Sequence, residues 1–311
     1  IRGATRGIHA EPWDKYVSIA CGEVFGAWVD LREGPTFGRV FTCVLDPSKA
    51  VFAPRGVGKS YQALKDGTIY TYLVEAHWSL EKKKTYTFVN LADPQLAINW
   101  PIPLDECELS EADRHHPYLK NVEPMAPKRT LVTGCKGQLG RALRIEAEKR
   151  GLREFEYADI DTFDFSDERA YENYDWDAYE TIINAGAYTA VDLAETDEGR
   201  ILAWKANAHG PALLARVATE HGITLVHISS DYVFDGSVAC HTEIEPFSPL
   251  GVYGQSKAAG DIAVSLAPKH YIFRSSWVVG DGKNFVRTMM NLSRRCADPE
   301  DELKKVKVVD D

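Results

Sequence analysis

The sequence predicts two domains: an all-β sandwich or barrel, followed by an α/β domain built on a parallel sheet. Its 311 residues are about the length of two ordinary domains. Between Val17 and Trp100, short β-rich runs alternate with turn residues such as Glu33-Gly34-Pro35, a spacing typical of an all-β domain. Beyond Lys128, short apolar runs alternate with helical patterns instead, which favours parallel strands covered by helices on both faces.

Composition excludes several classes of protein. Apolar residues make up 44% and charged residues 26% of the chain, as in ordinary soluble globular proteins. The net charge of -10 argues against a general nucleic-acid binder. No apolar run reaches the roughly 18–20 residues that span a bilayer, so no membrane partner is expected. No signal-peptide pattern opens the sequence and no CxxC pair occurs, so we expect a cytoplasmic protein with reduced thiols at Cys21, Cys43, Cys107, Cys135, Cys240 and Cys296.

The elements of the first domain follow from its β-rich runs. These runs lie at residues 16–31, 38–45, 50–56, 68–76 and 85–92. A polar stretch from Leu104 to Pro127, rich in acids, His and Pro, reads as a closing segment and a linker. We therefore predict a β-barrel domain over 1–122, a linker over 123–128 and a second domain over 129–311.

The second domain begins with a strand at 130–133, a glycine turn and a helix that runs to Arg150. Further strands are predicted at 180–184, 224–229 and 270–274, with helices at 198–221 and 256–267. Strands and helices that alternate in this way indicate a doubly wound sheet of the Rossmann kind.

Three glycines follow the first of these strands directly. In TLVTGCKGQLGRAL, Gly134, Gly137 and Gly140 permit a tight turn and let backbone N–H groups approach a pyrophosphate at a helix N-terminus. Asp159 lies 19 residues beyond Gly140, where an acid binds the ribose hydroxyls of NAD. Lys136 in the same loop would instead suit the 2′-phosphate of NADP, so NADH and NADPH both stay open. A structural turn and a surface acid are the plain alternatives.

A second motif in this domain carries acid–base chemistry. Tyr253 and Lys257 are four residues apart in YGQSK, so on a helix they share one face. A nearby ammonium favours the phenolate, and we therefore expect Lys257 to lower the pKa of Tyr253. Ser230 ends the strand LVHISS, at the edge where α/β sheets bind ligands, and its hydroxyl can polarise a carbonyl.

These residues resemble the extended short-chain dehydrogenases/reductases, and more narrowly the dTDP-4-dehydrorhamnose reductases. The matching stretches are TLVTGCKGQLG, INAGAYTAVDLAE, SSDYVFDG, PFSPLGVYGQSKAAGD and FRSSWVVGDGKNFVRTM. The resemblance implies NAD(P)H-dependent reduction of a 4-keto sugar nucleotide, with Tyr253 as proton donor. It also implies cofactor contacts at Gln138, Leu139, Asp164, Phe165, Ala185 and Ala187, and substrate contacts at Tyr232 and Trp277. The part of the family that closes over the sugar nucleotide is expected to lie outside this sequence.

The first domain carries a histidine among cations, in Arg6-Gly-Ile-His9 with Lys15 six residues on. An Arg and a Lys there can hold a diphosphate. Tyr72 lies within YTYLVEA. Taken one at a time, these residues are ordinary core or surface side chains.

As a set they resemble the dTDP-4-dehydrorhamnose 3,5-epimerases, which are cupin-type jelly-roll barrels. The resemblance rests on RGIH, GEVFGAWVDLREGPTFG, APRGVGKSYQAL, YTYLV, INWPIPL and LSEAD. It implies that His9 is the base, Asp113 its carboxylate partner and Tyr72 the proton donor, with Arg6 and Lys15 binding substrate.

The epimerase resemblance has four departures. Lys59 stands where the family has a second His, and could supply a cation to the developing enolate. Lys83 replaces an acid that contacts substrate, and His77 and Trp78 replace tyrosines. The first strand or two of the family's domain is expected to lie before Ile1.

The two resemblances belong to successive reactions, which predicts a bifunctional epimerase–reductase that makes dTDP-L-rhamnose. Its substrate is a dTDP-sugar and its cofactor NADPH or NADH, with Mg²⁺ as an additional candidate and no residue assigned as a metal ligand. We expect a homodimer. Three alternatives stay open: a reductase with a degenerate dimerising barrel, a regulatory subunit, and an epimerase/dehydratase with tightly held NAD.

Overall fold

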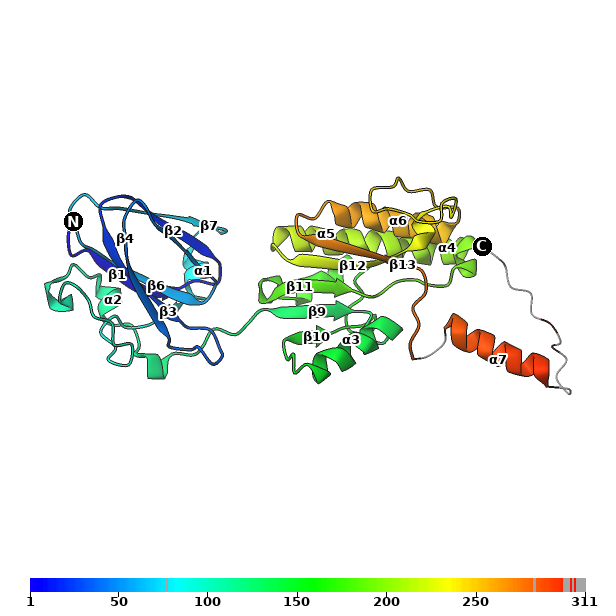
Figure 1. Cartoon of the computed structure of the whole chain (residues 1–311), viewed down its shortest axis with the longest axis horizontal. Helices are drawn as coiled ribbons and strands as arrows, with labels where there is room; N and C mark the ends of the chain where they lie inside the picture. Colours follow the sequence, from blue (N-terminus) through cyan, green and yellow to red (C-terminus); the bar gives the residue numbers. More distant parts are fainter. Residues whose placement is uncertain (77, 282–283, 299–302, 304, 306–311) are drawn as a thin grey trace. The chain divides into compact units, whose positions relative to one another are not determined.

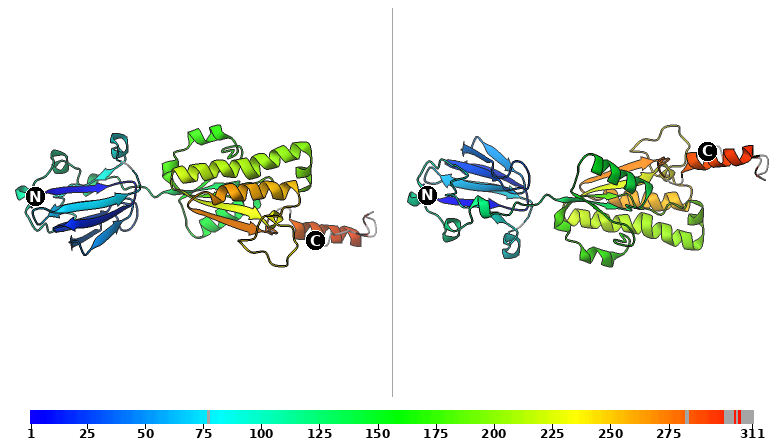
Figure 2. Two further views of the ribbon diagram at one scale, coloured as in Figure 1. Left: turned by 90° about the horizontal axis from the view of Figure 1, so that it is seen from above. Right: turned by 90° about the horizontal axis from the view of Figure 1, so that it is seen from below.

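The structure is a computed structural model that describes residues 1–76, 78–281, 284–298, 303 and 305. It divides into two compact units, Ile1–Pro127 and Lys128–Asp311. Figure 1 labels their elements, and Figure 2 shows the same chain from two further sides.

The first unit consists of two antiparallel sheets (Figure 1), which confirms the all-β prediction. A five-stranded sheet has the order β4-β3-β6-β1-β8, and a three-stranded sheet has the order β5-β2-β7. The strands are β1 (Thr5–Ala10), β2 (Lys15–Cys21), β3 (Val24–Asp30), β4 (Val40–Leu45), β5 (Ala50–Ala53), β6 (Val57–Ala63), β7 (Ile69–Val74) and β8 (Thr87–Phe88).

The long β-rich run at 16–31 forms two strands that belong to different sheets. It breaks at Gly22, whose φ of 85° is accessible to glycine at little cost and which leaves no room for a side chain beside Thr68. The inward residues of the two strands, among them Val17 of β2 and Trp28 of β3, then pack together in the core between the sheets. The turn at Gly22 therefore allows one stretch of chain to line both walls of the barrel.

The other face of the five-stranded sheet is covered by the segment that follows β8. Ile8 and Val29 of the sheet pack against Val89, Leu91 and Met125. This segment also contains the short helix α2 (Glu111–Arg114), which contacts β1. The remaining short helices of the unit are α1 (Leu80–Lys83) and the 3-10 turns Leu104–Glu106 and Leu119–Asn121.

The second unit is a five-stranded parallel sheet with the order β10-β9-β11-β12-β13, as the Rossmann prediction requires. Its strands are β9 (Arg129–Thr133), β10 (Phe155–Tyr157), β11 (Tyr179–Asn184), β12 (Thr224–Ser230) and β13 (His270–Ser275). Its helices are α3 (Gln138–Lys149), α4 (Asp197–Trp204), α5 (Gly210–Glu220), α6 (Val252–Ser265) and α7 (Phe285–Ala297). Helices lie on both faces of the sheet (Figure 2).

The helix predicted at 198–221 corresponds to α4 and α5, joined by a π-helical turn at Lys205–His209. Buried residues of α5, such as Leu214, pack with Ile182 and Leu225 of the central strands. Within the described part of the chain, none of the helices is both long enough and apolar enough to span a bilayer.

Candidate active sites

A cavity of about 510 Å³ opens at the carboxyl ends of the parallel strands in the second unit. Every predicted cofactor residue except Gly140 lines it, namely Gly134, Gly137, Gln138, Leu139, Asp159, Asp164, Phe165, Ala185, Ala187, Tyr253 and Lys257. Ser230 lines it as well. The structure thus brings together residues that are more than 120 positions apart in the sequence.

Glycine is required in the turn between β9 and α3 for steric reasons. Gly134 has a φ of 66°, and a Cβ atom there would lie 2.5 Å from the Cα of Gly186. Gly140 lies behind the loop, where a Cβ atom would come within 2.4 Å of the carbonyl oxygen of Gly134. Gly140 therefore acts by letting α3 approach the loop closely, which points the N-terminus of that helix at the cavity.

The acidic residues at this end of the cavity are held in place by hydrogen bonds. Asp159 accepts hydrogen bonds from the backbone N–H groups of Lys136 (2.7 Å) and Ile160 (2.9 Å). The ammonium of Lys136 pairs with Asp161 instead, at 2.7 Å, and this hydrogen bond raises the pKa of Lys136. Asp164 accepts hydrogen bonds from Ser166 and pairs with Lys205 at 3.3 Å; these contacts outweigh burial and lower its pKa.

Ser230, Tyr253 and Lys257 line the same cavity. Lys257 donates a hydrogen bond to the carbonyl oxygen of Ile228 at 2.6 Å, and burial lowers its pKa to about 8, with Asp261 opposing the shift. Burial raises the pKa of Tyr253, and a hydrogen bond with Ser230 offsets this only in part. The expected lowering of the Tyr253 pKa by Lys257 is therefore not found in this structure, because the ammonium is directed to a backbone carbonyl.

The two predicted substrate residues of this unit lie at the surface. The ring of Tyr232 packs edge-on against Tyr253, with the ring centroids 5.6 Å apart. Trp277 is exposed, packs against Phe285 and does not line the cavity.

Behind the cavity lies a buried polar network that the motifs did not reveal. Asp261 is fully buried and accepts a hydrogen bond from Arg274 at 2.9 Å. It follows Lys257 by one helical turn, a spacing that could have identified it. His227 lies 3.8 Å from Asp261, and burial holds its pKa well below the ordinary value.

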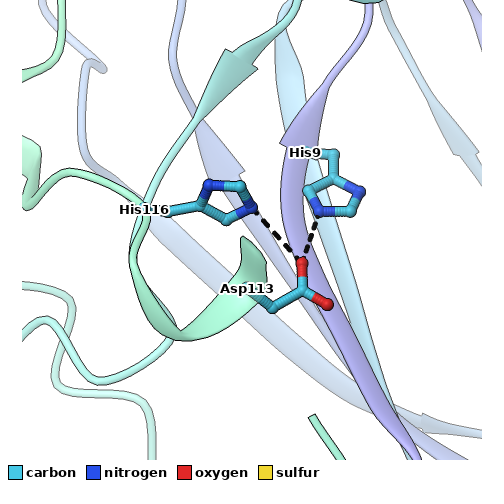
Figure 3. A group of neighbouring side chains, drawn as sticks. All are labelled: His9, Asp113 and His116. Carbon is cyan, nitrogen blue, oxygen red and sulfur yellow. Dashed lines mark hydrogen bonds and ion pairs between the residues drawn. The ribbon is translucent and has the colours of Figure 1, made fainter. Parts of the chain in front are cut away.

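In the first unit, His9 and Asp113 form the predicted pair. The Nε2 atom of His9 lies 2.7 Å from Oδ1 of Asp113 (Figure 3). A second histidine, His116, reaches the same oxygen at 3.3 Å and stacks on the ring of Phe88. Sequence reasoning missed His116, although it follows Asp113 by only three residues.

Asp113 is held as a carboxylate. It lies on α2, whose N-cap Ser110 donates a hydrogen bond to Asp113 Oδ2 at 2.7 Å. Burial alone would raise its pKa, but the hydrogen bonds from His116, His9 and Ser110 outweigh burial and hold the pKa of Asp113 far below its usual range. The carboxylate is thus available to orient His9 and to stabilise it once it is protonated.

The ring nitrogens of His9 and His116 and an oxygen of Asp113 lie within 4.8 Å of one another, as in a metal site. Two imidazoles and one carboxylate suit zinc or another transition metal better than Mg²⁺, which prefers oxygen ligands. We assign the group as a polar network centred on Asp113, which is hydrogen-bonded to His9 and Ser110, while His116 Nε2 lies 3.3 Å from Asp113 Oδ1.

Two lysines lie beside this network on a buried carboxylate. Lys59 of β6 pairs directly with His9 of β1 in the antiparallel ladder, so the two side chains share one face of the sheet. The ammonium of Lys59 contacts Oε2 of Glu11 at 2.5 Å, and that of Lys15 hydrogen-bonds to Oε1. Lys15 also lies 4.4 Å from the ring centroid of Tyr72. Glu11, which sequence reasoning missed, thus connects the predicted site residues of both sheets.

The other predicted site residues that the structure describes in this unit form no hydrogen bond or ion pair with His9, Asp113 or Glu11. Arg6 pairs with Glu108 at 3.3 Å and donates a hydrogen bond to its backbone carbonyl. Lys83 lies exposed on α1, and Trp78 is exposed as well. His77 lies outside the described residues.

A parallel sheet whose glycine turn, serine, tyrosine and lysine line one cavity defines a nucleotide-binding domain of the short-chain dehydrogenase/reductase class. Residues 128–311, more than half of the chain, match the family described as the RmlD substrate binding domain, and the chain belongs to that family. Residues 1–121 match the family described as dTDP-4-dehydrorhamnose 3,5-epimerase. Both resemblances drawn from the sequence are confirmed.

Individual relatives agree with this division. Over 124 residues, 40% of this chain and 62% of the relative, the chain is 55% identical to a "Protein RmlC homolog" of Streptococcus pyogenes. Over 170 residues, 53% of this chain and 57% of the relative, it is 39% identical to a dTDP-4-dehydrorhamnose reductase of Aggregatibacter actinomycetemcomitans. The crystal structure of the Bacillus anthracis dTDP-4-dehydrorhamnose reductase in complex with NADP is similar at a TM-score of 0.50 and 34% identity, covering 54% of this chain and 60% of that one. The chain thus spans about three fifths of the length of each of these relatives.

Proposed function

We propose that the protein epimerises dTDP-4-dehydro-6-deoxy-D-glucose at C3 and C5 and then reduces the 4-keto group with NAD(P)H, which yields dTDP-L-rhamnose. The observation that carries this proposal is that one chain contains the side chains of both reactions. His9 and Asp113 supply a base, and Ser230, Tyr253 and Lys257 supply a carbonyl-reducing site.

The first reaction depends on the tautomer of His9. With its Nε2–H donated to Asp113, the imidazole presents Nδ1 as a base. His9 breaks a C–H bond next to the ketone and takes the proton, while the electron pair moves to the ketone oxygen to form an enolate. Asp113 stays ionised and stabilises the resulting imidazolium.

Stabilisation of the enolate involves the sheet that carries His9, and its reprotonation involves the other sheet of the barrel. The ammonium of Lys59, beside His9, stabilises the negative oxygen. Tyr72 of β7, held beside Lys15, returns a proton from the opposite face of the sugar. Removal from one face and return from the other inverts the carbon.

The second reaction takes place in the cavity of the second unit. The nicotinamide supplies a hydride when the cofactor is bound. Tyr253 donates the proton that neutralises the carbonyl oxygen, and Ser230 donates a hydrogen bond to the same oxygen. Lys257, whose ammonium donates to the carbonyl oxygen of Ile228 in this structure, would bind the ribose of the cofactor.

Several further properties belong to the same proposal. The NADP bound by the B. anthracis relative supports NADPH, whereas Asp159 at the adenosine end of the cavity suits NADH. We propose a homodimer located in the cytoplasm, in keeping with six free cysteines. Mg²⁺ as an additional cofactor stays a prediction, to be checked by assays after EDTA treatment and after Mg²⁺ is restored.

The alternatives predict different outcomes of one assay. It measures NAD(P)H consumption by the complete gene product with dTDP-4-dehydro-6-deoxy-D-glucose as the only sugar, with and without an added separate 3,5-epimerase. Consumption without the added enzyme supports both activities. Consumption only with the added enzyme would indicate a degenerate, dimerising barrel. No consumption in either case would contradict the proposal and favour a regulatory subunit or an enzyme that keeps its NAD bound.

A further inference from the structure

Glu11 carries an inference that rests on the proposed epimerase function. Its side chain is only 7% exposed, and its two oxygens contact the ammonium groups of two lysines. Burying a carboxylate without partners is strongly unfavourable, so the two ammonium groups are what stabilises Glu11 in its charged form. The three groups together carry one net positive charge, which an enolate would neutralise.

Lys59 is the less expected of the two partners. Its side chain is 5% exposed, and apart from the ion pair with Glu11 its ammonium has no hydrogen-bond acceptor among the residues that the structure describes. Two of its three N–H groups therefore have no acceptor and are available as donors to an oxyanion, although the ammonium is closed off from solvent in this structure. Lys59 also pairs with His9 across β1 and β6, which places the available donors beside the base.

We propose that Glu11 is a positioning residue of the epimerase site, which keeps Lys59 protonated and directed at the substrate oxygen that becomes negative. Lys15, on the other oxygen of Glu11, is fixed at the same time against the ring of Tyr72. One carboxylate thereby links the base, the oxyanion-stabilising cation and the proton donor.

Electrostatics supports this role. The pKa of Lys59 is lowered, mainly by burial and also by the charge of Lys15. The negative charges of Glu11 and Asp14 oppose this shift. The pKa of Glu11 is itself lowered, because the two ammonium groups outweigh its burial. Without the negative charge of Glu11, burial and Lys15 would both favour neutral Lys59.

The tyrosines near Glu11 do not titrate in the working pH range, which simplifies the expected pH profile. Burial raises the pKa of Tyr86 to about 12, and that of Tyr70 further still, so both phenols stay neutral in the working range. A new loss of activity on the alkaline side in a Glu11 variant would therefore report the two lysines that Glu11 contacts, of which Lys59 is the more buried.

The test is Glu11→Gln in the complete gene product, which keeps the shape and removes the charge. The measurement is exchange of substrate protons with D₂O, followed by NMR from pH 6 to pH 9.5. We expect activity near that of the unmodified protein at pH 6.5 and about tenfold less at pH 9, since one pKa unit corresponds to tenfold. Glu23→Gln, which removes the partner of exposed Lys65, is the matched control and should keep the original profile.

The outcomes separate this inference from the proposed function. The inference would be overturned if the unmodified protein exchanges protons and the Glu11→Gln variant shows the same pH profile at a uniformly lower rate. That result would show that Glu11 only stabilises the fold. Absence of exchange in the unmodified protein would instead contradict the epimerase function itself. If Glu11→Gln fails to fold, Glu11→Asp, with a shorter carboxylate, should retain the flat alkaline profile at a reduced rate; a new alkaline loss in that variant would also overturn the inference.

Discussion

Asp113 connects activity and stability through a single carboxylate. Three hydrogen-bond donors, from His9, His116 and Ser110, surround it in the folded protein. We predict that Asp113→Asn lowers the rate of substrate-proton exchange by about 10²–10⁴-fold, because the amide can neither stabilise the imidazolium nor enforce the tautomer of His9. Asp105→Asn, at an exposed position, is the control and should leave the rate unchanged.

The same carboxylate predicts a pH-dependent stability. Because the pKa of Asp113 is lowered on folding, it stabilises the protein above its unfolded pKa, and this stabilisation is lost as the pH falls further. We expect Asp113→Asn to reduce the free energy of unfolding by about 2 kcal/mol at pH 7. Denaturant titrations should show this difference shrink below about pH 4; an equal difference at pH 3 and pH 7 would contradict the assignment.

Lys257 sets the alkaline limit expected for reduction. Its pKa is lowered to about 8, whereas the pKa of Tyr253 is raised, so the lysine loses its proton first as the pH rises. We predict that single-turnover reduction declines above about pH 8 and that Lys257→Arg moves the decline to higher pH, because arginine stays protonated. If the rate of Lys257→Arg declines at the same pH as that of the unmodified protein, another group sets the alkaline limit.

Residue by residue, the sequence predicted the side chains that recur in motifs and missed those defined by packing. His9, Asp113, Tyr253 and Lys257 stand in recognisable patterns. Glu11 is an unremarkable acid in sequence, and only the meeting of β1, β2 and β6 places two lysines on its oxygens. Likewise, the sequence suggested that Lys257 lowers the pKa of Tyr253, but the hydrogen bond to Ile228 could be seen only in three dimensions.

At the scale of elements, the position of α3 depends on a contact that admits only glycine. A Cβ atom on Gly140 would lie 2.4 Å from the Gly134 oxygen and 2.5 Å from the Cα of Cys135. We predict that Gly140→Ala moves α3 away from the loop, weakens NADPH binding at least tenfold and destabilises the second unit by about 1–3 kcal/mol. Titration calorimetry measures the affinity for NADPH, and thermal unfolding measures the stability. Lys149→Ala, at the exposed end of the same helix, should change neither; unchanged NADPH affinity in Gly140→Ala would contradict this account.

Elements with a strong periodic pattern were predicted closely, and their breaks were not. The strand predicted at 270–274 is β13 (His270–Ser275), and the helix predicted at 256–267 is α6 (Val252–Ser265). By contrast, nothing in the apolar pattern of 16–31 says that its two halves enter different sheets. That division depends on which strands each half pairs with, β5 and β7 for one and β4 and β6 for the other, and such pairing is not encoded locally.

For the whole molecule, the two compact units pose the question of how the intermediate passes between them. Each unit carries its own set of proposed catalytic side chains, so the proposed function requires the epimerised sugar nucleotide to leave the first site before Tyr253 donates a proton to it. If it passes through solution, the two activities need not reside on the same polypeptide. The short segment around Lys128 and Arg129 would then raise the local concentration at most.

Mixing two inactive variants tests this directly. His9→Asn lacks the base and Tyr253→Phe lacks the proton donor, so each alone should consume NADPH at least 10²-fold more slowly than the unmodified protein. We predict that an equal mixture recovers about half of the rate after a lag, because released intermediate reaches the intact reductase sites. The double variant His9→Asn/Tyr253→Phe, mixed with inactive protein of either kind, is the control and should recover nothing. If the mixture instead stays as slow as the single variants, although His9→Asn retains reduction and Tyr253→Phe retains epimerisation, the intermediate is handed over within one chain.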